Sequence, residues 1–362
     1  MPLMDTTLPA LIHSFADRHV VVLGEAMLDS YLMGRANRLC QEAPVPVVTL
    51  SDRQDVPGGA ANVAVNLRAL GAQVSFLSVI GEDESGDRLR QALEHCGVET
   101  DELLVQSARQ TLVKQRIMAE SQMVVRLDQG SMESIAPELE QSLIERLNKL
   151  IPSSDAIVIS DYSYGLLTPR VMEAIATLQA HTPKLLVVDS KRLARCRSLG
   201  ATVVKPNYEE ACRLLADQST MVETVMEDRS EFIAKHREQL LNLTGASMVI
   251  VTLDADGAII LQRQQPPQRI PVKSTVCKQA TGAGDTFISA LTLALGSQAP
   301  IAIAAELAVT AAAVVIAKEG TETCSLEELQ IALLNTQTPH DAAPASVWSR
   351  DTDGKPSTKE VA

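Results

Sequence analysis

The chain has 362 residues, of which 46% are hydrophobic and 21% charged, enough for one large domain with a single core or for two smaller domains. Its 45 Asp and Glu residues against 32 Lys and Arg give a net charge of −13, which argues against a surface for nucleic acid or an anionic membrane. We expect a cytoplasmic protein, because residues 1–16 lack a signal-peptide pattern and the six cysteines are scattered singly. The most apolar segment, 301–317, is interrupted by Glu306 and predicts a buried helix, not a membrane span.

Short apolar runs that end at a small or polar residue recur along the chain, and a helical pattern follows each. The runs lie at 20–23, 156–160, 185–188, 203–204 and 248–251. This alternation is typical of an α/β fold with a mostly parallel sheet. Ligands bind beyond the carboxyl ends of such strands. The polar residues near these ends should therefore face one crevice, although each could instead cap a helix: Asp29, Asp161, Asp189, Lys191, Asn207 and Thr252.

Two segments interrupt the alternation. Residues 31–50, which include Pro44 and Pro46, and residues 110–128 predict a small antiparallel flap. Such a flap could cover the crevice, and its exposed face could pair with a second copy of the chain, so we expect a homodimer through the flap. Residues 1–335 then form one domain with the flap inserted. The polar segment 336–362 is predicted to be a disordered tail.

The stretch 280–287 (ATGAGDTF) joins an apolar run at 270–276 to a helical pattern at 287–295. Its small residues let backbone N–H groups converge at a helix N-terminus, where phosphoryl oxygens bind. We therefore predict that Gly282, Ala283 and Gly284 hold a phosphoryl group. Asp285 would accept the proton of an attacking hydroxyl. The alternative is a glycine-rich turn in which Asp285 only caps the helix.

A second glycine turn, 58–64 (GGAANVA), also enters a helical pattern. Gly58 and Gly59 permit close approach of the backbone to a ligand, and Asn62 offers both a donor and an acceptor to sugar hydroxyls. An ordinary helix N-terminus with a capping Asn would give the same pattern.

Together the two glycine motifs resemble those of the ribokinase-like, pfkB-type carbohydrate kinases, over about residues 20–328. The segments 27–29 (MLD), 42–48 (EAPVPVV), 126–128 (RLD) and 160–162 (SDY) are similar to the heptose-7-phosphate 1-kinases. Those enzymes phosphorylate the anomeric hydroxyl of D-glycero-D-manno-heptose 7-phosphate. The resemblance implies a ribokinase-like fold, in which helices flank a mostly parallel sheet and a small flap forms a lid, and it implies ATP and Mg²⁺ as cofactors. Because the chain lacks a His-x-Gly-His signature, it implies kinase activity without a nucleotidyltransferase domain.

The resemblance also implies roles for individual residues. Asp285 would be the base, and the amides of 282–285 would form the anion hole. Glu210 and Asn207 would organise Mg²⁺, which prefers oxygen ligands and retains water, although this pair could equally cap a helix. The acceptor sugar would contact Asp29, Gly59, Asn62 and Asp161. The nucleotide would lie near Lys191, Asn207, Thr252, Gly257, Gly282, Gly284, Gly320 and Thr321.

Basic residues of the flap bear on the acceptor. Lys114 and Arg116 are two apart on a predicted strand, so their side chains share a face and could clamp an acceptor phosphate. Arg126 and Asp128 have the same spacing on the next strand. A solvated face with ordinary surface charge is the alternative. We predict a phosphorylated sugar as acceptor, namely a heptose 7-phosphate.

Five positions depart from the pattern of the heptose kinases: Glu25, Glu120, Tyr164, Ser190 and Gln279. Tyr164 removes a cation from the crevice, and Glu120 places a carboxylate on the flap, where it would repel an acceptor phosphate. Gln279 replaces an acidic residue before the anion hole, which argues against activation by a monovalent cation.

Two other functional classes stay open. One is a kinase for another sugar or a nucleoside, and the other is a catalytically weak regulator that binds a sugar or nucleotide. A dinucleotide-dependent oxidoreductase is disfavoured, because Gly24 is not followed by the Gly-x-Gly-x-x-Gly pattern after the first strand.

Overall fold

The computed structural model describes residues 8–120, 122–216, 228–272 and 281–337, and every structural statement below concerns these ranges. Their central sheet has the strand order β13-β12-β11-β10-β9-β8-β1-β4-β5. Neighbours from β5 to β11 pair in parallel, whereas β12 and β13 continue the sheet antiparallel. The strands are β1 His19–Gly24, β4 Gln73–Gly81, β5 Leu103–Gln106, β8 Ala156–Asp161, β9 Leu185–Ser190, β10 Val203–Val204, β11 Met248–Thr252, β12 Ala258–Gln262 and β13 Gln268–Ile270.

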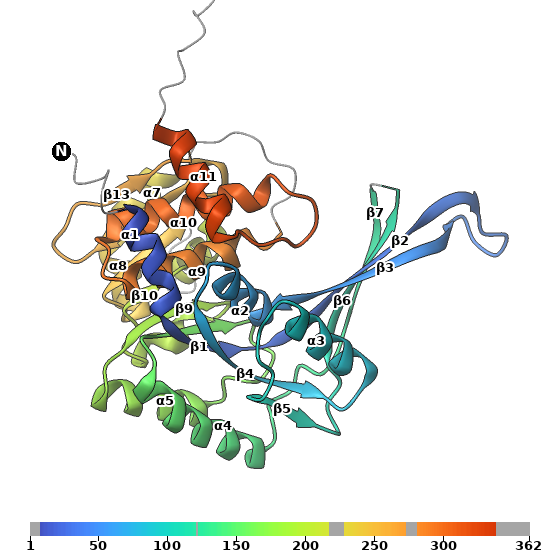
Figure 1. Ribbon diagram of the computed structural model, residues 1–362, viewed down its shortest axis with the longest axis horizontal. Helices are drawn as coiled ribbons and strands as arrows, with labels where there is room; N and C mark the ends of the chain where they lie inside the picture. Colours follow the sequence, from blue (N-terminus) through green and yellow to red (C-terminus); the bar gives the residue numbers. More distant parts are fainter. Residues whose placement is uncertain (1–7, 121, 217–227, 273–280, 338–362) are drawn as a thin grey trace, which may run out of the picture.

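The sheet separates two hydrophobic cores, because successive side chains of a strand point to opposite faces. In β1, Val20 and Val22 belong to one core and Val21 and Leu23 to the other. Helices cover both faces (Figure 1). The first core is packed by α1 Leu8–His13, α2 Ala60–Ala69, α3 Glu84–His95, α9 Ala283–Gly296, α10 Ile301–Ile316 and α11 Leu326–Gln337. The second is packed by α4 Pro137–Leu150, α5 Pro169–His181, α6 Tyr208–Ala216, α7 Arg229–Lys235 and α8 Arg237–Thr244.

The predicted sheet is confirmed, since the five apolar runs fall on β1, β8, β9, β10 and β11. Local chemistry sets several helix starts. Asp83 accepts a hydrogen bond from the N–H of Gly86 at the start of α3, and Thr168 caps α5 directly before Pro169. The apolar segment around 301–317 forms the buried helix α10, as predicted. In the described ranges, every helix is too short or too polar to cross a membrane.

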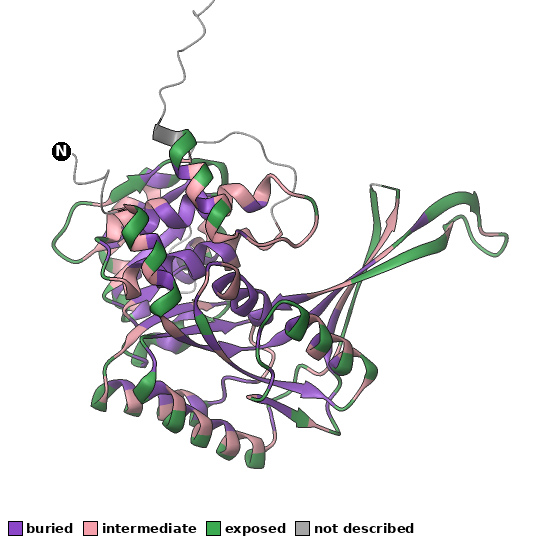
Figure 2. Cartoon of the chain, in the orientation of Figure 1, coloured by how far each residue is buried: buried purple, intermediate pink, exposed green. Residues whose placement is uncertain are grey.

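The flap projects from one side of the body (Figure 1). Its strands are β2 Ala26–Leu39, β3 Pro46–Gly59, β6 Leu112–Ala119 and β7 Gln122–Gln129, in the order β3-β2-β6-β7. Two antiparallel hairpins, as predicted, join through a parallel pairing of β2 with β6 that the sequence did not indicate. The first hairpin is longer than the predicted 31–50, and Figure 2 shows that its outer part is exposed while its base is buried.

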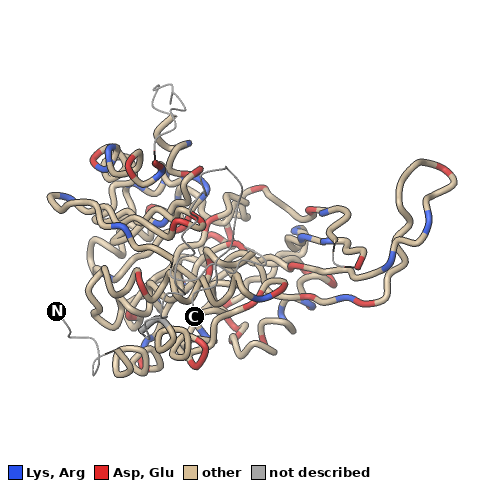
Figure 3. Tube along the Cα trace, turned by 90° about the horizontal axis from the view of Figure 1, so that it is seen from above, with Lys and Arg blue, Asp and Glu red and all other residues tan. Residues whose placement is uncertain are grey.

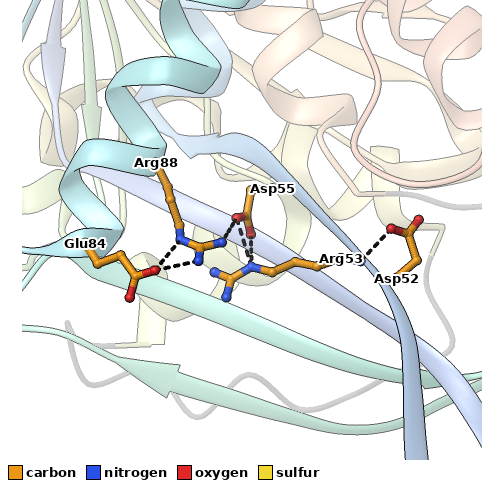
Figure 4. Close-up of polar contacts among 5 residues, drawn as sticks. All are labelled: Asp52, Arg53, Asp55, Glu84 and Arg88. Atoms are coloured by element: carbon orange, nitrogen blue, oxygen red, sulfur yellow. Dashed lines mark hydrogen bonds and ion pairs between the residues drawn. The ribbon is translucent and has the colours of Figure 1, made fainter.

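Charged side chains fix the base of the flap to α3 (Figure 4). Asp55 on β3 accepts hydrogen bonds from Arg53, at 2.9 Å, and from Arg88 on α3, at 3.1 Å; Arg88 also binds Glu84 at 2.6 Å. Burial raises the pKa of Asp55, but the hydrogen bonds and guanidinium charges lower it to below its usual value. Elsewhere, Lys and Arg are distributed over body and flap with acidic residues between them (Figure 3).

The first two residues of the predicted disordered tail, 336–362, are instead the last residues of α11. The tail lies outside the described residues from 338 onward, and so does Gln279.

Candidate active site

The N-terminus of α9 carries the predicted phosphoryl site. Gly282 precedes the helix in the left-handed conformation, with φ +83°, and a Cβ atom there would lie 3.0 Å from the side-chain nitrogen of Asn62. The left-handed backbone therefore favours glycine, and a side chain there would also press on the Asn62 amide. The N–H of Asp285 donates back to the carbonyl of Gly282, at 3.1 Å. This leaves the N–H groups of Ala283 and Gly284, which donate to no described group, as the amides open to an anion.

Asp285 lies inside the first turn of α9, and the cap position belongs to Gly282, so the alternative of Asp285 as a mere helix cap is wrong. Its carboxylate accepts a hydrogen bond of 2.7 Å from Asn62. Burial raises the pKa of Asp285 to about 7; the bond from Asn62 and the charge of Lys205 oppose this rise, while Asp189 and Asp29 add to it. A carboxylate with a pKa near neutrality is suited to act as a general base.

A buried cation that the sequence prediction did not assign lies beside this carboxylate. Lys205, directly after β10, has a side chain only 5% exposed, and its ammonium is 2.9 Å from Asp189. A Cβ atom at Gly284 would lie 3.5 Å from that ammonium. Burial lowers the pKa of Lys205, but the charges of Asp189, Glu210 and Asp285 raise it to a net value above normal, so Lys205 stays protonated. Its position directly after an apolar run was the signal in the sequence.

A pocket of about 550 Å³ opens in front of α9, at the carboxyl ends of the strands. Gly257 (φ +88°) lines it where a Cβ atom would lie 2.0 Å from the carbonyl of Ile270. The pocket brings together most of the predicted nucleotide and transfer residues: Lys191, Asn207, Glu210, Thr252, Gly257, Gly282, Ala283, Gly284 and Asp285. Its other wall is apolar and consists of Val272, Phe287, Val309, Ala312, Ala313 and Ile316.

Two residues predicted near the nucleotide, Gly320 and Thr321, are not among those that line the pocket, although a Cβ atom at Gly282 would lie 3.7 Å from the Thr321 side chain. The hydroxyl of Thr321 instead forms a hydrogen bond of 2.7 Å with that of Tyr31 on the flap. Thr321, which lies beside Gly282, therefore links the segment between α10 and α11 to β2 of the flap.

Asn207 and Glu210 cap α6 reciprocally. The N–H of Glu210 donates to the Asn207 side chain at 2.8 Å, and the N–H of Asn207 donates to the Glu210 carboxylate at 2.9 Å. Lys191 lies 2.5 Å from the other carboxylate oxygen of Glu210. Burial raises the pKa of Glu210, but Lys191 and the N–H of Asn207 lower it to below its usual value, so the carboxylate is ionised.

This donor set fits Mg²⁺ held largely through water and phosphate. Within the described ranges, no three His, Cys, Asp or Glu side chains converge on one point. Mg²⁺ is usually bound by one or two carboxylates together with substrate phosphates and several waters, so the ionised Glu210 at the pocket edge is sufficient.

The acceptor side of the site is built around Asp29 on β2. Its carboxylate forms an ion pair of 2.8 Å with Arg116, and both side chains are nearly buried. A Cβ atom at Gly58 would lie 2.5 Å from this carboxylate, which explains the first glycine of the turn. Gly59 has φ +58° and begins the turn into α2, where Asn62 reaches Asp285. The structure thus brings Asp29, Gly58, Gly59 and Asn62 close together, as predicted.

Asp161 has partners for both carboxylate oxygens: the N–H of Ser163 at 2.9 Å and the hydroxyl of Ser190 at 2.5 Å. Glu25 accepts hydrogen bonds from the N–H groups of Tyr162, at 2.8 Å, and Tyr164, at 3.0 Å. These contacts hold the loop that follows β8, so two of the departures from the heptose-kinase pattern, Glu25 and Ser190, position a loop.

The predicted phosphate clamp is divided in the structure. Arg116 is engaged by Asp29, and Arg126 is bound to Asp128 on the exposed β7. The ammonium of Lys114 forms no ion pair or hydrogen bond with any described residue and lies 5.0 Å from the centre of the Tyr162 ring, which lines the pocket. Glu120 is at the turn of the β6–β7 hairpin with φ +56°, at the end of β6 away from Lys114. Of the basic residues in the predicted clamp, Lys114 is therefore the one whose ammonium lies beside a residue of the pocket.

Comparison with known proteins identifies the family. The sequence model for pfkB family carbohydrate kinases matches residues 17–329. The chain belongs to the pfkB family of carbohydrate kinases. The predicted ATP-dependent carbohydrate kinase is thereby confirmed.

Relatives and solved structures agree with this assignment to the pfkB family. "Bifunctional protein HldE" of Desulfatibacillum aliphaticivorans is 37% identical over 327 residues, which cover 89% of this chain and 65% of that protein. The HldE protein of Shewanella denitrificans is 36% identical over 335 residues, 92% of this chain and 66% of that protein. The chain thus spans about two thirds of the length of these relatives.

The structural neighbours confirm the ribokinase-like fold. Phosphofructokinase-2 from Escherichia coli, in complex with potassium, has a TM-score of 0.72 and 20% identity, covering 89% of this chain and 99% of its own. Arabidopsis thaliana ribokinase, complexed with ribose and ATP, has a TM-score of 0.66 and 19% identity, covering 87% of this chain and 98% of its own. At these identities the likeness concerns the fold alone.

Proposed function

We propose that this pfkB kinase transfers the γ-phosphoryl group of ATP to a sugar hydroxyl, with Asp285 as the base. One observation carries the proposal: the Asp285 carboxylate, the open amides of Ala283 and Gly284 and the buried ammonium of Lys205 meet at one end of the pocket. Base, anion hole and cation are the parts that phosphoryl transfer requires besides positioning.

The step balances with these groups alone. Asp285 takes the hydroxyl proton as the sugar oxygen forms its bond to the γ-phosphorus, and the bond between that phosphorus and the bridging oxygen breaks, which releases ADP. The amides of Ala283 and Gly284 and the ammonium of Lys205 stabilise the negative charge on the phosphoryl oxygens. The apolar wall formed by α10 provides a surface for the adenine ring.

Bound Mg²⁺ neutralises phosphate charge during transfer. Glu210 and Asn207 would hold it through its water ligands. Lys191, whose side chain is 47% exposed at the pocket edge, would leave Glu210 to meet a phosphate oxygen.

We propose a phosphorylated sugar as acceptor, specifically the anomeric hydroxyl of D-glycero-D-manno-heptose 7-phosphate. The HldE relatives and the motifs shared with heptose-7-phosphate 1-kinases support this choice. Lys114 supports it too, because its half-buried ammonium lies over the Tyr162 ring and forms no ion pair with a described residue, although Asp29 and Asp128 act on it by charge.

The test is ADP release from ATP over a panel of sugars, sugar phosphates and nucleosides, with the product examined by phosphorus NMR. We expect the heptose 7-phosphate to be turned over fastest and to gain a phosphate at the anomeric carbon. Faster turnover of an unphosphorylated sugar or a nucleoside would assign a different acceptor. ATP binding without transfer to any acceptor would favour a regulator.

We also propose that two copies pair through the flap. Most of the large exposed hydrophobic side chains in the described ranges lie there: Met33, Leu39, Val45, Leu50, Met123, Val124, Val125 and Leu127. Exposed apolar side chains concentrated on one element are a feature of interaction sites. Light scattering should give the mass of a dimer, and Leu50→Glu with Leu127→Glu should give that of a monomer; an unchanged dimer would place the interface elsewhere. The cytoplasmic location also remains a prediction.

A further inference from the structure

A chain of buried hydrogen bonds runs behind Asp285. Asn62 donates to the Asp285 carboxylate at 2.7 Å. Asn66, one turn further along α2, donates to the backbone carbonyl of Asn62 at 2.9 Å and to its side-chain oxygen at 3.2 Å. Thr286 on α9 donates to the side-chain oxygen of Asn66 at 2.7 Å. Asn66 and Thr286 are fully buried, and neither lines the pocket.

The direction of this chain follows from one fixed point. The carbonyl oxygen of Asn62 can only accept, so the group of Asn66 that faces it must be the NH₂. That NH₂ also meets the side-chain oxygen of Asn62, which turns the NH₂ of Asn62 toward Asp285. The remaining oxygen of Asn66 then accepts from the hydroxyl of Thr286. Reversing the Asn62 amide would bring its oxygen against the Asp285 carboxylate and expose its NH₂ to that of Asn66.

We propose that Asn66 and Thr286 are positioning residues for phosphoryl transfer, which hold the Asn62 amide with its NH₂ toward Asp285. This inference rests on the proposed role of Asp285 as base. Neither residue lines the pocket, and both act through Asn62; the hydroxyl of Thr286 also lies 3.2 Å from the backbone carbonyl of Gly282 at the start of α9. Without them the amide of Asn62 is free to rotate, and the base loses a donor that fixes its rotamer and favours its ionised form.

Other charged groups also act on the pKa of Asp285. Asp189, Lys205 and Asp29 act on Asp285 by charge, from the ends of β9, β10 and the flap. They are untouched by substitutions at Asn66 or Thr286, so a change in the titration of Asp285 in those variants reports on Asn62.

The first test compares Asn66→Leu and Thr286→Val with wild type. Thr286→Val keeps the shape of the side chain and removes only the hydroxyl. We expect kcat at pH 7 to fall about tenfold for Asn66→Leu and less for Thr286→Val, because a hydrogen bond to a charged group is weakened. The acidic limb of the profile of kcat against pH should move to higher pH by about one unit, and KM for ATP should stay within about twofold of the wild-type value. Thr286→Ser, which restores the hydroxyl, should recover both values.

Ser289→Ala is a matched control for loosening of the same helix contact. The hydroxyl of Ser289, fully buried on α9, donates to the backbone carbonyl of Asp285 at 2.7 Å and lies 3.2 Å from the carbonyl of Val63 on α2, but it touches neither the Asn62 amide nor the Asp285 carboxylate. It should lower thermal stability as Thr286→Val does while leaving the acidic limb in place. Equal shifts of that limb in Ser289→Ala and Thr286→Val, or no shift in Thr286→Val, would overturn the proposal.

A readout without turnover separates this inference from the proposed function. Carbon NMR of protein labelled at the Asp carboxyl carbons, with Asp285→Asn for assignment, follows the protonation of Asp285 directly. A higher midpoint in Thr286→Val than in wild type supports the positioning role even if the acceptor is another sugar. An unchanged midpoint in both variants would refute it even if wild type is an active kinase.

Discussion

The junction of α2 with α9 and the flap both present polar side chains to the site, but these side chains differ in their burial and in their hydrogen-bond partners. At the junction, Asn62, Asn66 and Thr286 are buried and joined to one another and to Asp285 by hydrogen bonds. On the flap, Arg126 and its partner Asp128 are substantially exposed, and Lys114 rests on an aromatic ring. The junction therefore has one geometry, whereas the flap can adjust.

This difference separates the two tasks of a kinase. Transfer needs a base and an anion hole held in place before the substrate arrives, which a buried network provides. Acceptor choice and pairing with a second copy need exposed groups, which the flap provides. Substitutions at the junction should mainly change rate, and substitutions on the flap should mainly change acceptor affinity or assembly.

The largest expected effect is that of Asp285→Asn, which should preserve the fold but remove the proton acceptor. Loss of general-base help reduces turnover by about a hundred- to ten-thousand-fold. Steady-state ADP release measures the loss, and displacement of a fluorescent nucleotide should show unchanged ATP binding. Turnover within a few-fold of wild type would mean that the junction does not carry the chemistry.

The flap side of the comparison is tested by Lys114→Ala. Loss of a charge-assisted contact worth about 1.5 to 3 kcal/mol should raise KM for a phosphorylated acceptor by about 10- to 150-fold, with KM for ATP unchanged. Arg126→Ala is the matched control, since Arg126 is on the neighbouring strand and is bound to Asp128. If both variants raise KM equally, or neither does, Lys114 is not the phosphate ligand.

The same contrast governs what could be predicted from sequence. The strands and the anion-binding N–H groups at the start of α9 were predictable, because apolar runs and the Gly-Ala-Gly-Asp spacing are local patterns. Lys205 directly follows β10, whereas its partner Asp189 lies on β9. Their contact therefore depends on the order of β9 and β10 in the sheet.

Two other features depend on distant segments. Arg116 reaches Asp29 only through the parallel pairing of β2 with β6, a register that strand patterns do not specify, so the acidic partner of this clamp residue could not be predicted. The spacing of Asn62 and Asn66 by one helical turn was visible and places both on one face of a helix. Their partner Thr286 comes from α9, which only the folded chain brings close.

Glu210→Gln should have an intermediate effect, on metal dependence. The substitution removes the charge beside Lys191 but keeps an oxygen that can accept from the N–H of Asn207, so α6 should remain capped. The Mg²⁺ concentration for half-maximal activity should rise several-fold, measured by titration at saturating ATP. Glu209→Gln, an exposed neighbour on the same helix, should leave the titration unchanged. Identical curves for both variants and wild type would reduce Glu210 to a helix cap.

The smallest expected effect is on stability, and its sign depends on pH. The folded chain raises the pKa of Asp285 from 3.8 to about 7, so above that pH the folded state keeps a carboxylate charge that is better solvated in the unfolded chain. Asp285→Asn removes this penalty and should raise the melting temperature at pH 8 by about 2 to 4 °C per kcal/mol relieved. As the pH falls through 7, wild-type Asp285 takes up a proton in the folded state first, so the advantage of the variant should shrink toward pH 4.

Thermal unfolding without ligands at pH 8 and pH 5 measures the difference, with Asp101→Asn at an exposed site as control. A variant less stable than wild type at pH 8, or an advantage that grows on acidification, would show that the junction stabilises the Asp285 carboxylate in its ionised form.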